Sequence, residues 1–81
     1  MLKEEELERL TEVFRTLFDI PDIEIRDSLA AKDIDDWDSF NHINLIINIE
    51  QEFNVRFTSE EVSGMQNVGD LKKILAAKIY K

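Results

Sequence analysis

The 81 residues of the chain make one domain, residues 1–81, and leave no room for a second. A domain this small has a thin core that disfavours a deep substrate cleft, so we expect a carrying or binding role rather than catalysis. Ten basic residues against 18 acidic ones give a net charge of −8, which disfavours nucleic acids and anionic membranes as partners and favours basic protein surfaces.

The residue types exclude several kinds of site. The chain has no cysteine and one histidine, which excludes disulfides, a cysteine nucleophile and a multi-histidine zinc site. The N-terminus is charged from its third residue, and no apolar run approaches the ~20 residues that a membrane span needs. We therefore expect a soluble, cytoplasmic monomer without a targeting segment.

Residues 3–18 have the pattern of an amphipathic helix. Their apolar positions recur at spacings of three and four, with two further residues widening the stripe: Leu7, Leu10, Phe14 and Leu17, then Val13 and Phe18. Pro21 cannot continue a helical hydrogen-bond ladder and pushes the residue before it out of helical geometry. The helix should therefore end at residues 19–21.

Residues 19–38 form a long acidic connection. The segment holds eight acidic and two basic residues, so it carries six of the eight net negative charges. Connections this long in a small domain are either functional or contain short turns of their own. We expect four apolar side chains to hold it against the core: Ile23, Ile25, Leu29 and Ile34.

The second helix, residues 39–53, has two apolar stripes. At about 100° per residue, one stripe contains Leu45, Ile46, Ile49 and Phe53, and the other contains Phe40, Ile43 and Ile47. The first is the natural core face. The second either lies under another element, in a helix buried all round, or faces solvent and marks a partner site.

The rest of the chain predicts a short helix and a final one. Thr58 and Glu61 have the spacing of a capping box, and Gly64 should end the short helix. Asp70 caps or opens the last helix, whose inner face is formed by Leu71, Ile74, Leu75 and Ile79.

Two chemical interpretations of residues 33–42 have little support. A calcium loop opened by Asp33 would need glycine at Asp38 and glutamate at Asn44, so a solvated acidic loop is the better interpretation. Asp38, Ser39 and His42 have the residue types of a hydrolytic triad, but no Gly-x-Ser-x-Gly turn or oxyanion hole accompanies them. His42 is better explained as a helix residue bordering the core, with a polar edge left in water.

Ser39 lies where the acidic loop meets the second helix. A serine there is most simply an N-cap, whose hydroxyl accepts a hydrogen bond from the following turn. The same position suits a phosphoester, because a helix N-terminus presents free amides and partial positive charge to an anion. The location therefore allows a covalent attachment without requiring one.

The segment Asp33-Ile34-Asp35-Asp36-Trp37-Asp38-Ser39-Phe40, with the Ile/Leu-rich helix that follows, resembles the acyl carrier proteins. The resemblance covers nearly the whole chain and implies an all-α fold. That fold is a four-helix bundle of the acyl-carrier type, with three long helices, a short third helix and a long first loop. In that family the attachment serine lies in an Asp-Ser-Leu-type motif that opens the second helix. Asp27-Ser28-Leu29 matches this motif more literally than Asp38-Ser39-Phe40 does, but only Ser39 opens a long amphipathic helix.

The resemblance also implies a function. The chain would be a non-catalytic carrier whose Ser39 is esterified by 4′-phosphopantetheine, with Asp38 as part of recognition by a phosphopantetheinyl transferase. Acyl or related intermediates would be held as thioesters and presented to loading, synthase or transferase enzymes with basic docking patches. By position, the docking residues would be Phe40, Ile43, Ile47 and Glu50. The core residues of the second helix would support the helix and line a sheath for an acyl chain: Leu45, Ile46, Ile49 and Phe53.

The sequence departs from the family pattern at three positions. Asn44 replaces a common acid, Phe40 replaces leucine, and Trp37 replaces glycine or alanine. Asp-Trp-Asp-Ser resembles carriers of specialised pathways, so we expect polyketide, peptide, modified-lipid or polysaccharide-linked biosynthesis rather than the main fatty-acid pathway. Two alternatives remain open: an aminoacyl, D-alanyl or peptidyl carrier, and an unmodified interaction module that uses the second stripe.

Overall fold

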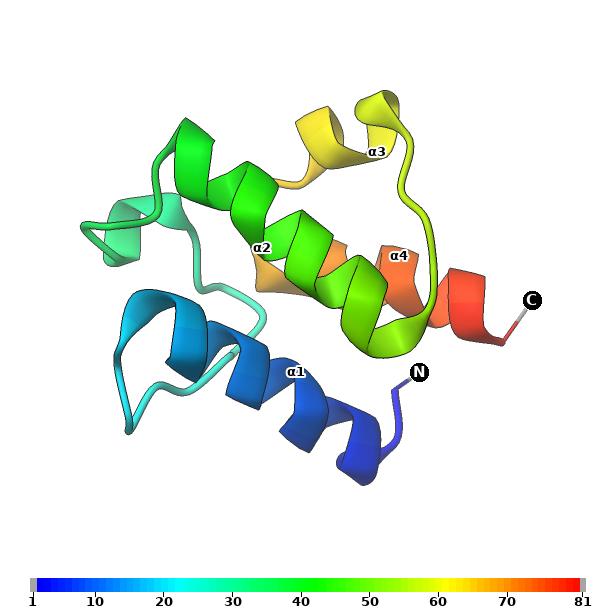
Figure 1. Ribbon diagram of the computed structural model, residues 1–81, viewed down its shortest axis with the longest axis horizontal. Helices are drawn as coiled ribbons and strands as arrows, with labels where there is room; N and C mark the ends of the chain where they lie inside the picture. The colour runs from blue at the N-terminus through cyan, green and yellow to red at the C-terminus, as the bar shows by residue number, and fades with distance from the viewer. Residues whose placement is uncertain (1, 81) are drawn as a thin grey trace.

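The computed structural model describes residues 2–80, and this part of the chain is helical without any strand. It contains four α-helices and one 3-10 turn (Figure 1), namely α1 (Glu4–Phe18), η1 (Ala31–Asp33), α2 (Ser39–Phe53), α3 (Ser59–Gly64) and α4 (Val68–Ile79). The predicted bundle of three long helices and a short third one is confirmed. None of the helices within residues 2–80 combines the length and apolar character needed to cross a bilayer.

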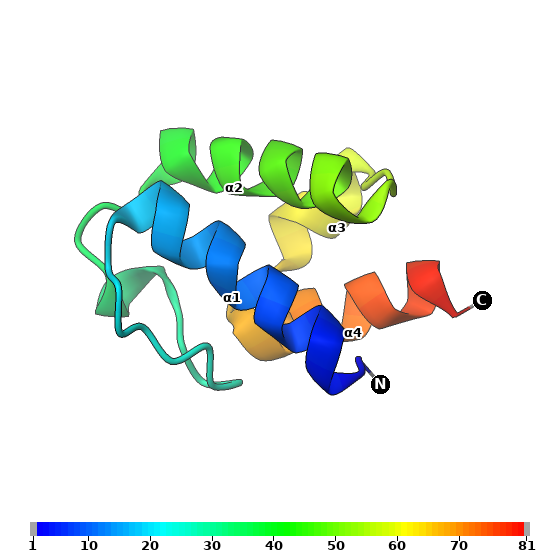
Figure 2. The ribbon, with the colours of Figure 1, turned by 60° about the horizontal axis from the view of Figure 1, so that its bottom comes forward.

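The helices α1 and α2 lie side by side and run in opposite directions (Figures 1 and 2). The long loop therefore returns at the end where α1 stops and α2 begins. The helix α1 ends as predicted, because Asp19 takes a left-handed conformation two residues before Pro21.

The core is formed by the inner faces of the three long helices. Leu10 and Phe14 of α1, Leu45 and Ile49 of α2, and Leu71 and Leu75 of α4 are all buried. The predicted apolar anchors of the loop are buried as well: Ile23, Ile25, Leu29 and Ile34. Trp37, which the sequence did not assign to the core, is also buried against Phe14 and Phe18 of α1, with ring centroids 5.6 and 5.7 Å away.

The loop is also held to the start of α4 by backbone hydrogen bonds. The amide of Val68 donates to the carbonyl of Leu29 at 2.8 Å, and the amide of Gly69 donates to the carbonyl of Asp27 at 2.9 Å. A Cβ atom at Gly69 would lie 3.1 Å from Cβ of Asp27. A glycine in the first turn of α4 therefore allows the two backbones to approach this closely.

The caps of α3 and α4 were predicted in part. Thr58 and Glu61 form the expected capping box of α3. The prediction that Asp70 caps or opens α4 is wrong, because α4 begins at Val68 and the side chain of Asn67 accepts a hydrogen bond from the amide of Asp70 at 2.9 Å. Asn67 is the better cap because its side chain precedes the free amides of the first turn.

Glu61 gives the fold a testable dependence on pH. Its carboxylate accepts a hydrogen bond from Lys78 and a second from the backbone of Thr58, which hold the pKa of Glu61 below its ordinary value of 4.5. The unfolded chain therefore binds this proton more readily than the folded one. The contribution of Glu61 to stability should be complete above pH 4.5 and disappear as the pH falls through the lower folded value.

Urea unfolding of the wild type and of Glu61→Gln at pH values from neutral to acidic would measure this contribution. The difference in unfolding free energy between the two chains should shrink as the pH falls below 4.5. A difference that stays constant with pH would contradict the assignment.

Candidate functional site

Ser39 is the first residue of α2, and Asp38 before it is the helix cap. The Oδ1 atom of Asp38 accepts a hydrogen bond from the amide of Asn41 at 2.8 Å, and Asp38 has extended backbone angles. The prediction that Ser39 caps the helix is therefore wrong. Aspartate is as good a cap as serine, and the carboxylate already reaches the free amide of the first turn. This leaves the exposed hydroxyl of Ser39 free of any capping role.

Ser39 borders a surface pocket of about 390 Å³. The pocket lies between the end of the long loop, the first turns of α2 and the segment joining α3 to α4, and its lining residues are Ala31, Trp37, Asp38, Ser39, His42, Met65 and Gln66. A phosphoester on the Ser39 hydroxyl would lie at the N-terminal end of a 15-residue helix, where the helix dipole favours negative charge. The residues present therefore fit a phosphate-linked group at this position.

The second apolar stripe of α2 is exposed. Phe40, Ile43 and Ile47 expose 74%, 57% and 44% of their surface. On the opposite face, Leu45, Ile46 and Ile49 are buried. The alternative of a helix buried all round is therefore wrong, and the stripe runs along α2 from the residue next to Ser39. Neighbouring exposed apolar residues of this size are typical of a protein interaction site.

The acidic residues near the end of α2 are already engaged within the chain. Oε2 of Glu50 accepts a hydrogen bond from the amide of Phe57 at 2.8 Å, which holds the α2–α3 connection. Glu52 pairs with Arg9 of α1, with Nε and Oε2 2.7 Å apart. The role of Glu50 in docking stays a prediction, and any partner would meet a carboxylate that also accepts a hydrogen bond from the backbone.

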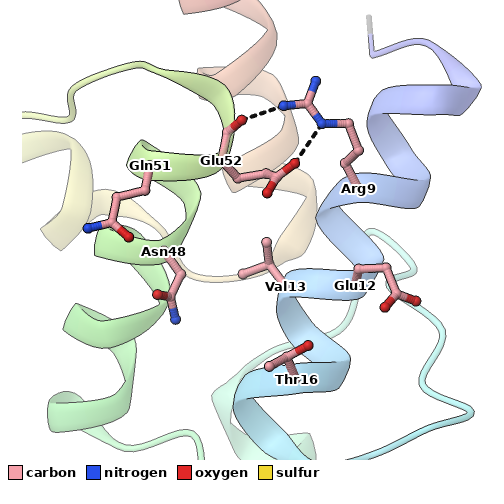
Figure 3. Close-up of a pocket in the computed structure, with 7 residues that line it drawn as sticks. All are labelled: Arg9, Glu12, Val13, Thr16, Asn48, Gln51 and Glu52. Carbon is pink, nitrogen blue, oxygen red and sulfur yellow. Dashed lines mark hydrogen bonds and ion pairs between the residues drawn. The ribbon is translucent and has the colours of Figure 1, made fainter.

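A second hollow of about 460 Å³ lies between α1 and α2 (Figure 3). The side chains of Arg9 and Glu52, which both line it, are paired with each other. None of the predicted site residues lines it. The guanidinium of Arg9 at this hollow is already paired with Glu52, so we assign the hollow no function.

The sequence predicts that His42 leaves its polar edge in water, but in the structure both ring nitrogens have partners within the protein. Its Nδ1 atom accepts a hydrogen bond from Nε1 of Trp37 at 3.1 Å, and its Nε2 atom lies 3.3 Å from the carbonyl oxygen of Val62 in α3. Because both ring nitrogens have partners, neither is available to activate Ser39 as in a triad. The signal that sequence reasoning missed was Trp37, since a buried indole N–H usually finds an acceptor.

Ser28, the competing attachment residue, has a different setting. It is exposed in the loop, and its hydroxyl accepts a hydrogen bond from Nε of Arg26 at 3.1 Å. The chain after it contains only the three-residue turn η1 before α2. Of the two serines, only Ser39 stands at the start of a long helix.

The acidic run has local backbone partners. Oδ2 of Asp33 accepts a hydrogen bond from the amide of Ala30 at 3.0 Å, and Asp38 caps α2. Within residues 2–80, no group of three or more ligating side chains is arranged to hold a metal ion.

The chain is similar to known proteins over most of its length. No protein-family model matches it. An acyl carrier protein of Acidothermus cellulolyticus is 30% identical over 74 residues, covering 91% of this chain and 88% of that protein. The solution NMR structure of a holo acyl carrier protein from Geobacter metallireducens superposes with a TM-score of 0.84 at 38% identity, covering 90% of this chain and 84% of that one.

A putative acyl carrier protein from Mycobacterium tuberculosis shares the fold. Its TM-score is 0.78 at 21% identity, and the match covers 88% of this chain and 95% of that one. The match to the Acidothermus protein extends over nearly the full length of both chains, so the resemblance is not confined to the motif around Ser39. The chain belongs to the acyl carrier protein family.

Proposed function

We propose that this carrier holds acyl intermediates as thioesters on a 4′-phosphopantetheine arm attached to Ser39. The observation that carries the proposal is the position of Ser39. It is an exposed residue at the start of α2, and its hydroxyl is not needed as a cap because Asp38 caps the helix. When bound, the group supplies a thiol at the end of a flexible arm, which the cysteine-free chain does not itself contain.

The chain's own residues would act in three ways. The Ser39 oxygen forms the phosphoester with the phosphorus next to pantetheine in coenzyme A, the pyrophosphate bond breaks so that adenosine 3′,5′-bisphosphate leaves, and the serine proton passes to the modifying enzyme. The N-terminal amides of α2 and its dipole favour the phosphate charge. The core face of α2 keeps the helix fixed while the arm moves, which raises the effective concentration of the intermediate at a docked enzyme.

The partners we propose are a phosphopantetheinyl transferase and the enzymes that load or consume the intermediate. The exposed stripe Phe40, Ile43 and Ile47 runs from the attachment residue along α2 and offers an apolar docking surface. The net charge of −8 favours partner surfaces with basic patches around it. We also propose that the carrier serves a specialised pathway, and the support for this is the Asp-Trp-Asp-Ser sequence alone.

Intact-protein mass spectrometry tests the attachment directly. The purified chain is incubated with coenzyme A, magnesium and a broad-specificity phosphopantetheinyl transferase, beside Ser39→Ala and Ser28→Ala. The wild type and Ser28→Ala should each gain one phosphopantetheine group, and Ser39→Ala should gain none. Ser39→Ala should unfold within about 0.5 kcal/mol of the wild type, because the cap of α2 is Asp38.

The other outcomes separate the alternatives. A gain on Ser39→Ala but not on Ser28→Ala would move the attachment to the loop. No gain on the wild type with several transferases would reject the proposal and favour an unmodified interaction module that uses the same stripe. If the arm is attached, supplying the carrier with loading enzymes for acyl groups or for amino acids distinguishes an acyl carrier from an aminoacyl, D-alanyl or peptidyl one.

A further inference from the structure

The only tryptophan and the only histidine of the chain are joined beside Ser39. Trp37 is buried, and its Nε1 atom donates to Nδ1 of His42 at 3.1 Å. The planes of the two rings are inclined by only 27°, with centroids 6.1 Å apart. On its other side, Nε2 of His42 lies 3.3 Å from the carbonyl oxygen of Val62. His42 therefore bridges the end of the long loop and α3.

Both partners require the same protonation state of the imidazole. An indole N–H can only donate a hydrogen bond, and a carbonyl oxygen can only accept one. A neutral ring satisfies both when its single proton is on Nε2 and its lone pair is on Nδ1. A protonated ring would direct a second N–H from Nδ1 at the N–H of Trp37, so the bridge is compatible with the neutral ring alone.

The bridge is continuous with the attachment residue. His42 follows Ser39 by one helical turn and lines the same pocket. Its backbone amide donates to the carbonyl of Asp38 at 2.8 Å, inside the turn that carries the serine. The contacts of the imidazole therefore link this turn to α3 and to the end of the long loop.

We propose that His42 is a positioning residue for the modification of Ser39. As a neutral ring protonated on Nε2, it holds the first turn of α2, the Trp37 side chain and α3 in the single arrangement that a transferase recognises. This inference rests on the proposed function, since it concerns the same serine. Loss of the bridge loosens the attachment site without removing any atom that takes part in the transfer.

Each partner of His42 has an acidic neighbour in the chain. Asp38 follows Trp37 and lines the same pocket as His42. From α3, Glu61 precedes Val62, but its carboxylate is paired with Lys78 of α4 at 2.8 Å. Phe14 and Phe18 of α1, which pack on Trp37, and Met65 and Gln66, which line the pocket, are uncharged.

NMR of the wild-type chain tests the tautomer without any mutation. Because the chain has one histidine, its two ring nitrogens give one pair of ¹⁵N signals, and one indole N–H signal comes from Trp37. At about pH 8, where a histidine is neutral, we expect the proton on Nε2 and none on Nδ1. A proton on Nδ1 at this pH would overturn the proposal.

The rate of Ser39 modification tests the positioning role. His42→Gln keeps an acceptor and a donor, whereas His42→Phe keeps a ring and loses both hydrogen bonds. At about pH 8, His42→Gln should be modified with a kcat/KM close to that of the wild type. His42→Phe should be about thirtyfold slower, the effect of losing two ordinary hydrogen bonds of about 1 kcal/mol each.

Modification of His42→Phe at the wild-type rate would overturn the positioning role even if Ser39 is modified normally. So would a rate for His42→Gln as low as that of His42→Phe, because His42→Gln keeps a donor and an acceptor. If none of the three chains is modified, the proposed function fails, and the tautomer observed by NMR then decides the bridge alone.

Discussion

Ile46→Asn should remove a large part of the stability of the chain, whereas Ile47→Asn, one residue later, should leave it almost unchanged. Ile46 exposes 5% of its surface in the core, and Ile47 exposes 44% on the outer stripe of α2. Burying an amide in place of Ile46 removes apolar contacts and leaves polar atoms without partners, which together cost about 3–5 kcal/mol. A chain of this length is stable by only about 4–12 kcal/mol. At Ile47 the loss should be about 1 kcal/mol at most.

The same pair of substitutions separates folding from docking. Asparagine leaves the net charge at −8, so long-range attraction to a basic partner is unchanged. Ile47→Asn should lower kcat/KM for modification by a phosphopantetheinyl transferase about tenfold, through KM, because an apolar contact made equally in the bound and transition states is lost. Circular dichroism and urea unfolding measure the fold, and initial rates measure the docking.

An exposed residue away from the stripe provides the control. Asn48 is exposed on α2 next to Ile47 in the sequence. Asn48→Ala should change the free energy of unfolding by at most about 0.5 kcal/mol and the rate of modification by at most about twofold. Modification of Ile47→Asn at the wild-type rate would show that the transferase does not use this end of the stripe. If Ile46→Asn unfolded cooperatively at the same urea midpoint as the wild type, the assignment of the two faces would be contradicted.

The two faces of α2 could be predicted because they follow from helical periodicity alone. Residues 39–53 keep two apolar stripes under a 100° rotation, and a small domain has enough core contacts to bury one of them. The stripe next to the predicted attachment residue was the one left exposed. The end of α1 was predictable for a similar local reason, since Pro21 fixes the geometry of its own neighbourhood.

The details that sequence reasoning missed depend on contacts between distant segments. Gly69 is explained by its approach to Asp27, a residue 42 positions earlier, and nothing near Gly69 in the sequence indicates it. The cap of α2 was assigned to Ser39 because Asp38 and Ser39 are both good capping residues, and one position decides between them. The acceptor for Trp37 is determined by how the loop turns into α2.

Trp37 is the clearest such case, and Trp37→Ala should destabilise the chain by about 3–5 kcal/mol. In the sequence it stands alone among aspartates, without apolar periodicity, so it could be read only as part of a motif. In the structure its ring fills the space between Phe14, Phe18 and His42. Removing the indole would leave a cavity lined by aromatic rings and would deprive Nδ1 of His42 of its donor.

Trp37→Phe is the matched control, because it keeps an aromatic ring in the cluster and removes the N–H donor. It should cost about 1 kcal/mol in urea unfolding, well below Trp37→Ala. Equal losses of stability in Trp37→Phe and Trp37→Ala would show that the hydrogen bond to His42, and not the packing of the ring, is what Trp37 contributes.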